Sequence, residues 1–457
     1  MSSVAVIGGG ITGLTAAYRL QQQGKEVTLF EASDRPGGVI RTIREGGFLA
    51  ECGPNTLLET SPKISQLVAD LGLEERRLDP NPDSDSRYIL RGGKPVRMAS
   101  SPLGFLMSPL FSFGAKLRLI LEPFIRRSPA EAEESLADFV KRRLGQEFLD
   151  YAINPFVAGI YAGDPHRLSV KQAFPKLHAL EQKYGSLIGG QIRGARQRKK
   201  SGAISKDKAN KFSFDEGLQV LTDTLCEKLG DSVRLDTPVR GVRCSADGNG
   251  VTVIAGEKSE SFDSVLLAMP AYRLAELDLA GSEVSLALLS EINYPPVSAV
   301  VLGFRREEVA HSLNGFGTLN PELEGVSTLG TIFSSSLFPD RAPKGHVTLT
   351  TYVGGMRSPD LALKSPEELV ELTLEDLRSI YGVTGDPVFR KTFTYQKAIP
   401  QYDIGYGRFR ELMSQCEEAN PGLFLAGHCR DGISLGDSIV SGHDVADRIE
   451  EFLKSGR

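Results

Sequence analysis

Three glycines and one acidic residue near the N-terminus have the types and spacing of a nucleotide-binding site. The glycines are Gly8, Gly10 and Gly13, in a GxGxxG arrangement, and Glu31 follows downstream. Glycines at this spacing permit a tight turn, close approach of the backbone to a pyrophosphate, and close packing of a helix on a strand. A carboxylate at the position of Glu31 accepts hydrogen bonds from ribose hydroxyls and disfavours a 2′-phosphate. The pattern predicts dinucleotide binding and argues against NADP.

These residues need a strand, a helix and a second strand in direct succession to hold them. The run SSVAVIG has the character of a short apolar strand, GGGITGLTAAYRLQQQG turns into a helix, and KEVTLFE is a second strand. The start of the predicted helix offers amide groups to phosphates. A plain glycine-rich turn of an α/β protein is the alternative, but the acid that ends the second strand favours the nucleotide site.

Two further glycine-rich segments favour FAD over a nicotinamide cofactor. Arg35, Gly37 and Gly38 lie just beyond the second strand, where the chain must follow a cofactor that continues past its pyrophosphate. Near the other end of the chain, residues 423–426 are typical of a strand, and a glycine-rich loop and a helix from about Ser438 follow. A helix start offers amides to a flavin ring or ribityl chain. A domain built from both ends of the chain suits FAD better than NAD.

Composition and charge exclude several other classes of protein. The chain has 457 residues, a net charge of −5 and 40% hydrophobic residues, which is typical of a globular protein of two or three domains. Without a basic excess, nucleic acid is not an expected partner. The five cysteines are scattered and the six histidines have no ligand spacing, which favours a reducing compartment and no metal site. Without a spanning apolar run or secretion signal, we expect a cytoplasmic location.

The interior of the chain alternates between helical and strand patterns. Ser365 and Glu368 have the spacing of a capping box at the start of a helix. The basic and aperiodic run 196–211 is typical of a solvated loop. The predicted elements are helices over residues 61–73, 130–145, 213–231 and 365–382, and strands within residues 237–270.

The motifs at both ends resemble the amine-oxidase and phytoene-desaturase superfamily of flavoproteins. They are GGGITGL and FEASDRPGG near the N-terminus and LFLAGHCRDGISLGDSIVSG near the C-terminus. Interior segments are similar to the protoporphyrinogen oxidases, particularly the plant mitochondrial form; among them are DYAINPFVAGIYAGDP, FPKLHALEQKYGSLIGG and TLGTIFSSSLFPDRAP. The resemblance covers essentially the whole chain. It implies FAD and an oxygen-dependent, six-electron oxidation of protoporphyrinogen IX to protoporphyrin IX, in three rounds that each give hydrogen peroxide.

The resemblance also implies a fold of three parts. They are an α/β FAD-binding domain of Rossmann-like, amine-oxidase type, an inserted α+β substrate domain, and a helical membrane-associated domain. The family tends to form homodimers. The implied boundaries are 1–83, 234–273 and 397–457 for the FAD domain, 84–188 for the helical domain, and 189–233 and 274–396 for the substrate domain.

The apolar stretch 100–124 falls in the implied helical domain. The resemblance places it on a membrane surface without spanning the bilayer, so that a porphyrinogen could enter from the membrane. The alternative is that these side chains form the core of a helical subdomain. The expected membrane-facing residues are Phe105, Leu106, Leu110, Phe111 and Phe113, and the expected partners of anionic headgroups are Lys116, Arg118, Arg126 and Arg127.

Matched position by position, the resemblance implies a substrate site. Arg87 corresponds to the family residue that pairs with a substrate propionate. Leu319 and Ile332 correspond to the residues that enclose a pyrrole ring. Tyr352 stands at the aromatic stacking position, where Phe is usual, and its extra hydroxyl needs a partner.

The remaining implied residues are catalytic or contact the flavin. Gly159 corresponds to the glycine that lies close to the substrate, and Asn55 to a residue between flavin and substrate. The implied flavin contacts are Gly8, Gly9, Gly10, Ile11, Thr12, Gly13, Glu31, Ala32, Arg35, Gly37, Gly38, Val39, Gly53, Pro54, Asn55, Thr56, Val239, Ala426, Ile433, Ser434 and Leu435.

Three other functions stay open from the sequence. A coproporphyrinogen III oxidase of the same fold would differ only in its substrate. An amine oxidase or carotenoid desaturase is supported by the shared ends of the chain alone. Prenyl-chaperone proteins have the fold without the flavin, and the intact glycines and Glu31 disfavour them.

Overall fold

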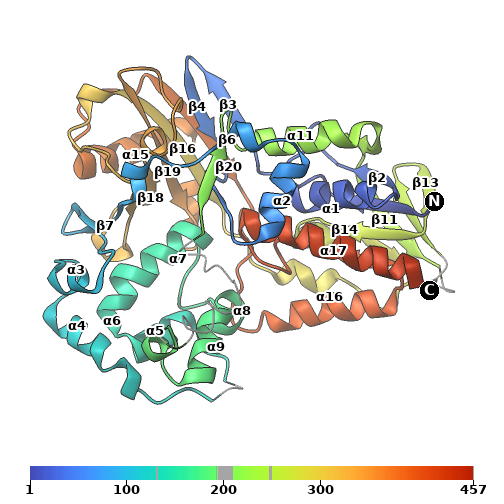
Figure 1. Ribbon diagram of the computed structural model, residues 1–457, viewed down its shortest axis with the longest axis horizontal. Coiled ribbons are helices and arrows are strands. Elements are labelled where there is room, and N and C mark those ends of the chain that lie inside the picture. Colours follow the sequence, from blue (N-terminus) through green and yellow to red (C-terminus); the bar gives the residue numbers. More distant parts are fainter. Residues whose placement is uncertain (130–131, 192, 194–208, 246–249, 456–457) are drawn as a thin grey trace.

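A parallel sheet of five strands forms the centre of the nucleotide-binding region (Figure 1). The computed structural model describes residues 1–129, 132–191, 193, 209–245 and 250–455 of the chain. Helix α1, Ile11–Gln22, follows β1 and precedes β2 in the chain, and these two strands pair in parallel, so the predicted succession of strand, helix and strand is confirmed. The sheet has the order β10-β2-β1-β14-β21, with β1 Ser3–Ile7, β2 Glu26–Phe30, β10 Val233–Arg234, β14 Ser264–Leu267 and β21 Leu423–Leu425.

Helix α17, Leu435–Ser455, packs against α1 and brings the C-terminal part of the chain to this sheet. Small residues allow the two helices to approach closely, because a Cβ on Gly442 would lie 2.6 Å from the carbonyl oxygen of Thr12. The helix begins about one turn before the predicted Ser438. The side chain of Ser434 accepts a hydrogen bond from the amide of Asp437 at 3.1 Å and so caps this earlier start.

The strands predicted within residues 237–270 are confirmed, the last of them as β14 of the parallel sheet and the others in a second, mixed sheet. Its order is β13-β12-β11-β15, with β11 Val239–Cys244, β12 Val251–Ala255, β13 Lys258–Phe262 and β15 Asp278–Ala280. Strand β11 begins beside the end of β2, because the amide of Thr237 donates to the carbonyl of Glu31 at 2.9 Å.

A seven-stranded sheet forms the other large layer of the molecule (Figure 1). Helix α15, Pro366–Tyr381, covers one face with apolar residues such as Leu369 and Leu377. The predicted capping box of α15 is confirmed, since Ser365 and Glu368 exchange hydrogen bonds between side chain and backbone. The sheet order is β20-β16-β19-β18-β17-β7-β8, with β7 Arg87–Arg91, β8 Lys94–Arg97, β16 Val297–Arg305, β17 Gly317–Leu319, β18 Thr328–Ile332, β19 His346–Gly354 and β20 Phe389–Tyr395.

Two segments lie in a different layer from the one that the predicted boundaries imply. Strands β7 and β8 belong to the seven-stranded sheet, although residues 84–188 were expected to be helical. Strand β9, Lys211–Phe214, pairs with β5, Leu57–Leu58, and β6, Arg77–Leu78, of the nucleotide-binding region. Helix α11, Gln219–Leu229, packs against α1, and the two phenylalanines of β9 complete the same core. The helix predicted over 213–231 therefore begins only after this strand.

The helical region, from α3 to α9, lies below the seven-stranded sheet in the view of Figure 1 and consists of short helices. Helix α5 begins at Leu136, later than the predicted range 130–145, because Ser135 caps it by accepting from the amide of Asp138. Of the basic run 196–211 that was predicted as a loop, residues 196–208 lie outside the described part of the chain. The helices are α3 Pro102–Met107, α4 Phe113–Ile120, η3 Glu122–Phe124, α5 Leu136–Arg143, α6 Gln146–Phe148, η4 Leu149–Ile153, α7 Asn154–Tyr161, α8 Val170–Ala173 and α9 Pro175–Tyr184.

A buried group of charges holds this helical region together. Arg143 is fully buried on α5 and contacts Glu122 at 3.1 Å and Glu181 at 2.7 Å. Glu122 belongs to η3 and Glu181 to α9, so three separate helices share the buried charges. Glu122 also accepts hydrogen bonds from the hydroxyl of Ser186 and the amide of Leu187, and its buried carboxylate is therefore well satisfied.

The apolar stretch 100–124 is divided between core and surface. Leu110 and Phe111 are only 3% and 6% exposed and pack on Ile89, so the prediction that they face a membrane is wrong. Phe105 is partly buried against Phe111, with ring centroids 5.4 Å apart. Across the described part of the chain, no helix is long and apolar enough to cross a bilayer. The exposed apolar side chains of the stretch are Leu103, Leu106, Met107, Phe113, Leu117, Ile120, Leu121 and Phe124.

The remaining elements connect these layers. A two-stranded ladder of β3, Thr42–Glu45, and β4, Phe48–Glu51, projects from the nucleotide-binding region toward the seven-stranded sheet. The helix predicted over 61–73 is confirmed as α2, Pro62–Asp70, with Ser61 as its cap. The other helices are α12 Ala271–Leu274, α13 Ser334–Leu337, α14 Pro359–Ala362 and α16 Gly407–Ala419.

Candidate active site

The start of α1 forms a cradle for an anionic group. Gly10 precedes the helix, and no side chain of a described residue caps it. A Cβ added to Gly10 would have no described atom within 4 Å, whereas a Cβ on Gly13 would lie 1.9 Å from the carbonyl oxygen of Gly8. The helix is therefore closely packed at Gly13 and open at Gly10. Open amides at the positive end of a helix bind phosphate, so the cradle fits the pyrophosphate of FAD.

Glu31 lies at the end of β2, beside this cradle. One carboxylate oxygen accepts from the amide of Gly9 at 2.7 Å, and the other accepts from the amide and hydroxyl of Ser33 at 2.9 and 2.7 Å. The oxygen that accepts from Gly9 keeps a second lone pair that a ribose hydroxyl can use. Ala32 follows Glu31 directly, and the pairing of Thr237 with Glu31 brings the start of β11, with Val239, to the same place.

The second pair of glycines closes over the first. The amide of Gly37 donates to the carbonyl of Gly9 at 2.7 Å, and a Cβ on Gly38 would lie 3.6 Å from the Cα of Gly10. Arg35 shapes this turn by donating to the carbonyl oxygens of Pro36, Gly38 and Ile40 at 3.2, 2.6 and 3.1 Å. These bonds orient its guanidinium toward the backbone of the loop. Val39, at the tip, is half exposed.

The loop between β21 and α17 completes the predicted flavin site from the other end of the chain. The amide of Gly427 donates to the hydroxyl of Ser441 at 3.0 Å, and a Cβ on Gly427 would lie 3.7 Å from the hydroxyl oxygen of Thr12. Ala426 and its neighbour are thus beside the start of α1. The predicted flavin contacts Ile433, Ser434 and Leu435 are partly exposed and lead into α17, which begins at Leu435.

The predicted substrate residues share one face of the seven-stranded sheet. Leu319 pairs across the strands with Gly330, and Gly330 pairs with Tyr352. In the next row, Gly317 lies between Arg87 and Ile332. Cross-strand partners, and residues two apart on one strand, point to the same side of a sheet. Four residues that the sequence reasoning assigned to the substrate, Arg87, Leu319, Ile332 and Tyr352, therefore project from the face opposite α15.

Gly159 lies on α7, which crosses this face. A Cβ on Gly159 would lie 2.4 Å from Cδ2 of Leu319, which is closer than two carbon atoms can approach. Glycine at this position allows α7 to rest directly on the leucine. At the edge of the same face, Arg87 is exposed, and no carboxylate of the described chain forms an ion pair with it.

Asn55 joins the substrate face to the predicted flavin residues. Its amide nitrogen donates to the hydroxyl of Tyr352 at 2.5 Å and to the carbonyl of Gly53 at 3.3 Å. The hydroxyl of Tyr352 in turn donates to the carbonyl of Gly53 at 2.9 Å. Burial raises the pKa of Tyr352 well above its usual value, so the hydroxyl stays a donor. The additional hydroxyl that distinguishes Tyr from Phe thus has its partner in the segment 53–56, which includes Pro54 and Thr56.

A small pocket beside Asn55 contains two charged residues that the sequence reasoning missed. Glu51 is 4% exposed, and it accepts from the hydroxyl of Thr42 at 2.7 Å and the amide of Leu218 at 2.8 Å. Burial raises its pKa to about 7. The signal available in the sequence was an acid at the end of the apolar run FLAEC. The pocket is lined by Leu49, Glu51, Asn55, Ser334, Leu337, Phe338 and Arg341.

Comparison with known proteins identifies the family. The model of flavin-containing amine oxidoreductases matches residues 11–450. Protoporphyrinogen oxidase 2 of Arabidopsis thaliana, chloroplastic/mitochondrial, is 38% identical over 99% of this chain and 94% of its own. Coproporphyrinogen III oxidase of Bacillus subtilis (strain 168) is 30% identical over 96% of both chains.

Solved structures give the same result. A proposed protoporphyrinogen oxidase from Exiguobacterium sp. 255-15 aligns with a TM-score of 0.82 and 26% identity, over 98% of this chain and 99% of that one. The cyclohexylamine oxidase of Brevibacterium oxydans IH-35A shares the fold at 19% identity and a TM-score of 0.69, over 99% of each chain. The chain therefore belongs to the flavin-containing amine oxidoreductase family and, within it, to the FAD-dependent protoporphyrinogen oxidases.

Proposed function

We propose that this protein oxidises protoporphyrinogen IX to protoporphyrin IX, with FAD as cofactor and oxygen as the final electron acceptor. The single face that carries Arg87, Leu319, Ile332 and Tyr352, joined through Asn55 to the flavin residues, supports this function most directly. The higher identity to protoporphyrinogen oxidases, 38% against 30%, favours this substrate over coproporphyrinogen III.

FAD supplies a two-electron acceptor that oxygen can restore. Because the substrate loses six electrons, it must stay bound in one orientation, or return to it, for three rounds that each form one hydrogen peroxide. The protein therefore has to hold a flat, mostly apolar ring and its acidic side chains. Binding geometry of this kind is what the predicted substrate residues provide.

Each substrate residue has a role that its surroundings support. The guanidinium of Arg87 would bind a propionate through charge-assisted hydrogen bonds, since no carboxylate described in the structure pairs with it. Leu319 and Ile332 would enclose a pyrrole ring, and the ring of Tyr352 would stack on it. The bond from Tyr352 to Gly53 fixes the ring of that tyrosine relative to the flavin region.

Asn55 and Gly159 would set the distance between substrate and flavin. Asn55 is 9% exposed and is held by Tyr352, so its amide can orient the substrate without a large loss of freedom. Gly159 keeps α7 close to Leu319 and so limits the space between this helix and the face of the sheet. Neither residue needs to move a proton in this scheme.

We also propose that the helical region rests on a membrane surface. The exposed apolar residues of α3, α4 and η3, with Phe113 at 82% and Phe124 at 85% exposure, form the contact. Lys116 donates to the carbonyls of Leu106 and Ser108, and Arg118 to carbonyls of α5, so these two cations mainly hold the helices. The contacts with anionic headgroups are then left to the exposed Arg126 and Arg127.

These assignments give a chain of three regions. The flavin region comprises the parallel sheet with α1, α11 and α17, the substrate region is the seven-stranded sheet including β7 and β8, and the helical region lies below the seven-stranded sheet in the view of Figure 1.

Porphyrin fluorescence tests the function. Purified protein with FAD in air is given protoporphyrinogen IX or coproporphyrinogen III at equal concentration, and the initial rates are compared. We expect the first substrate to react faster. A clear preference for the second would assign the chain to coproporphyrin formation, and no turnover of either by a protein that absorbs near about 450 nm, as oxidised flavins do, would refute both.

A further inference from the structure

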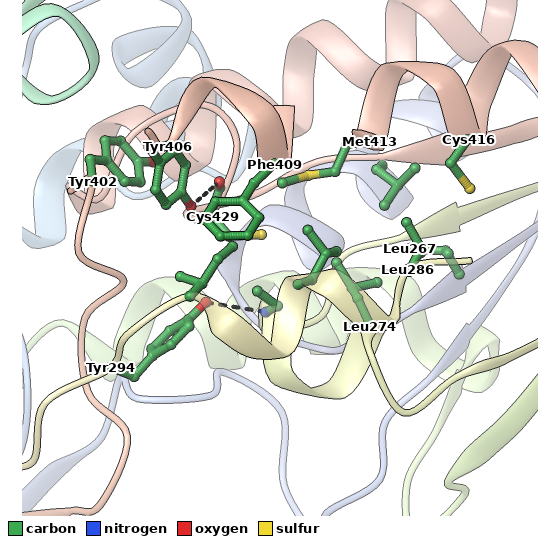
Figure 2. Packing of buried hydrophobic residues seen from close by; sticks show 14 of the residues in the cluster. Leu267, Leu274, Leu286, Tyr294, Tyr402, Tyr406, Phe409, Met413, Cys416 and Cys429 are labelled. Carbon is green, nitrogen blue, oxygen red and sulfur yellow. Dashed lines mark hydrogen bonds between the residues drawn. The ribbon is translucent and has the colours of Figure 1, made fainter. Parts of the chain in front are cut away.

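Three side chains hold three successive carbonyl groups in the loop between β21 and α17. Their positions are spaced by four residues, in and just before the start of α16. Figure 2 shows Tyr402 and Tyr406 beside each other, with the hydroxyl of Tyr406 directed at the backbone of Cys429. We name Tyr402, Tyr406 and Arg410 the carbonyl clamp. Its hydrogen bonds run from Tyr402 to His428, from Tyr406 to Cys429 at 2.6 Å, and from the Nε of Arg410 to Arg430 at 2.9 Å.

The two tyrosines of the carbonyl clamp are buried, Arg410 is partly buried, and the three side chains pack on one another. Tyr402 and Tyr406 are 2% and 1% exposed, and their ring centroids lie 4.4 Å apart. The guanidinium of Arg410 lies 4.8 Å from the centroid of the Tyr402 ring. Burial raises the pKa of both tyrosines far above the usual value, so both hydroxyls remain hydrogen-bond donors wherever the protein is folded. Without a hydroxyl, a buried carbonyl would lose its partner.

The same loop leads into the flavin residues. The turn 427–431 is closed by amides of Arg430 and Asp431 that donate to the carbonyl of Gly427 at 2.9 and 3.0 Å. Ile433, two residues beyond this turn, begins the segment 433–435 at the start of α17. The position of that segment therefore depends on the backbone that the carbonyl clamp holds.

The carbonyl clamp also contacts the helical region. Arg410 donates to the side chain of Gln172, on α8, at 2.7 Å, and the amide of Ser169, the cap of α8, donates to the carbonyl of Tyr402 at 2.9 Å. Next to Tyr402, Asp403 pairs with Arg167 at 2.8 Å. The carbonyl clamp is thus anchored outside the loop that it holds, which is what a positioning device requires.

We propose that Tyr402, Tyr406 and Arg410 are positioning residues for FAD, which fix the backbone of residues 428–430 so that residues 433–435 meet the flavin in one geometry. This inference rests on the flavin lying against that loop, as in the proposed function. None of the three side chains needs to touch the cofactor.

FAD binding by the apoprotein tests the proposal directly. Apoprotein is prepared from wild type, Tyr402→Phe and Tyr406→Phe, and FAD is added while its fluorescence quenching and visible spectrum are recorded. Each variant keeps the ring and its packing but leaves one buried carbonyl unpaired, so we expect the dissociation constant for FAD to rise about tenfold. The vibrational shoulders of the bound flavin spectrum should also broaden, because the flavin is held less uniformly.

Tyr88→Phe is the matched control. The hydroxyl of Tyr88 donates to the carbonyl of Asn314 at 2.7 Å, in the seven-stranded sheet and away from the flavin loop. This variant also loses a bond from a tyrosine hydroxyl to a backbone carbonyl, at an exposed site, and its FAD affinity should equal that of wild type.

Each other outcome has a definite meaning. If Tyr402→Phe and Tyr406→Phe lower the melting temperature but leave the FAD dissociation constant within twofold of wild type, the carbonyl clamp only stabilises the fold and the proposal is wrong. If neither tyrosine variant folds, Arg410→Lys, which keeps the charge but loses the Nε donor, replaces them and must weaken FAD in the same way. If wild-type apoprotein itself does not bind FAD, the proposed flavin site fails instead.

Discussion

The contact between Gly159 and Leu319 allows a quantitative prediction for Gly159→Ala. The new Cβ would lie 2.4 Å from Cδ2 of Leu319, and carbon atoms in contact need about 3.5 to 4.0 Å. The end of the leucine side chain must therefore shift by more than about 1 Å, across the face that carries Tyr352 and Ile332. Displacement of this size in a positioned site lowers turnover by about 100-fold.

The same substitution should leave the protein stable. The clash involves the flexible end of a side chain and not a backbone atom, and alanine favours a helix over glycine by about 1 kcal/mol. We therefore expect an unchanged or higher melting temperature together with about 100-fold lower kcat/KM for protoporphyrinogen. Steady-state porphyrin fluorescence and thermal unfolding measure the two quantities on one preparation.

Two further variants make this test specific. In Gly114→Ala on α4, the nearest described neighbour of the new Cβ is the Ser112 hydroxyl oxygen at 3.9 Å, so activity should be that of wild type. Leu319→Ala removes the clashing atom, and the double variant with Gly159→Ala should be no slower than Leu319→Ala alone. A wild-type kcat/KM in Gly159→Ala would show that the space between α7 and the face of the sheet does not limit turnover.

Three other predictions concern the substrate, a buried acid and the surface. Arg87→Ala should raise the KM for protoporphyrinogen about tenfold with little change in kcat. Arg97→Ala, on the opposite face of the sheet, should leave the KM unchanged. Equal effects of the two substitutions in steady-state assays would reject the binding of a propionate by Arg87. Native Glu51 keeps its proton up to about pH 7, while the unfolded chain releases it near 4.5. The resulting stabilisation is complete below pH 4.5 and is lost as the pH rises to about 7, a change of roughly 3 kcal/mol. When the free energy of unfolding in urea is measured at several pH values, Glu51→Gln should lack this loss of stability between pH 4.5 and about 7. An identical pH dependence in the variant and in wild type would contradict the prediction. The double variant Phe113→Asp, Phe124→Asp should reduce sedimentation of the protein with anionic vesicles at least about tenfold. Leu323→Asp, which changes an exposed apolar residue outside the helical region, should not. Unchanged binding in the double variant would show that α4 and η3 do not contact the membrane.

The N-terminal cradle was predictable because its determinants are local. Gly8, Gly10, Gly13 and Glu31 lie within one strand, helix and strand, and the conformation of each glycine follows from a turn or a close contact in that unit. The capping box at Ser365 was predictable for the same reason. Spacing along the chain was sufficient in both cases.

The substrate face could not be derived from spacing, because it depends on register between distant strands. Arg87 reaches Gly317 through a parallel pairing of β7 with β17, and nothing near Arg87 in the sequence encodes that partner. The resemblance to a family supplied these residues where local reasoning could not. The partner of the Tyr352 hydroxyl, the carbonyl of Gly53, depends in the same way on two layers meeting.

The division of the apolar stretch also needed the structure. Leu110 and Phe111 are core because β7 passes beneath them with Ile89, while Phe113, two residues on, is exposed. The sequence has no period that separates these residues. Strands β7 and β8, which follow the predicted boundary at residue 84, find their partners only in strands far downstream, and no local pattern encodes that pairing.

The buried charges around Arg143 affect how the exposed apolar surface can behave. The helix η3, which carries Phe124, also carries Glu122. If this carboxylate left Arg143, a fully buried ion pair would break, at a cost of about 3 to 5 kcal/mol, although Arg143 would keep its pair with Glu181. The exposed apolar residues near η3 are therefore held rigidly against the rest of the helical region and do not move independently of it. A force or torque applied at Phe124 would pass through η3 and α5 into the helices beside the substrate face, so that tilting of the surface would tilt the site as well.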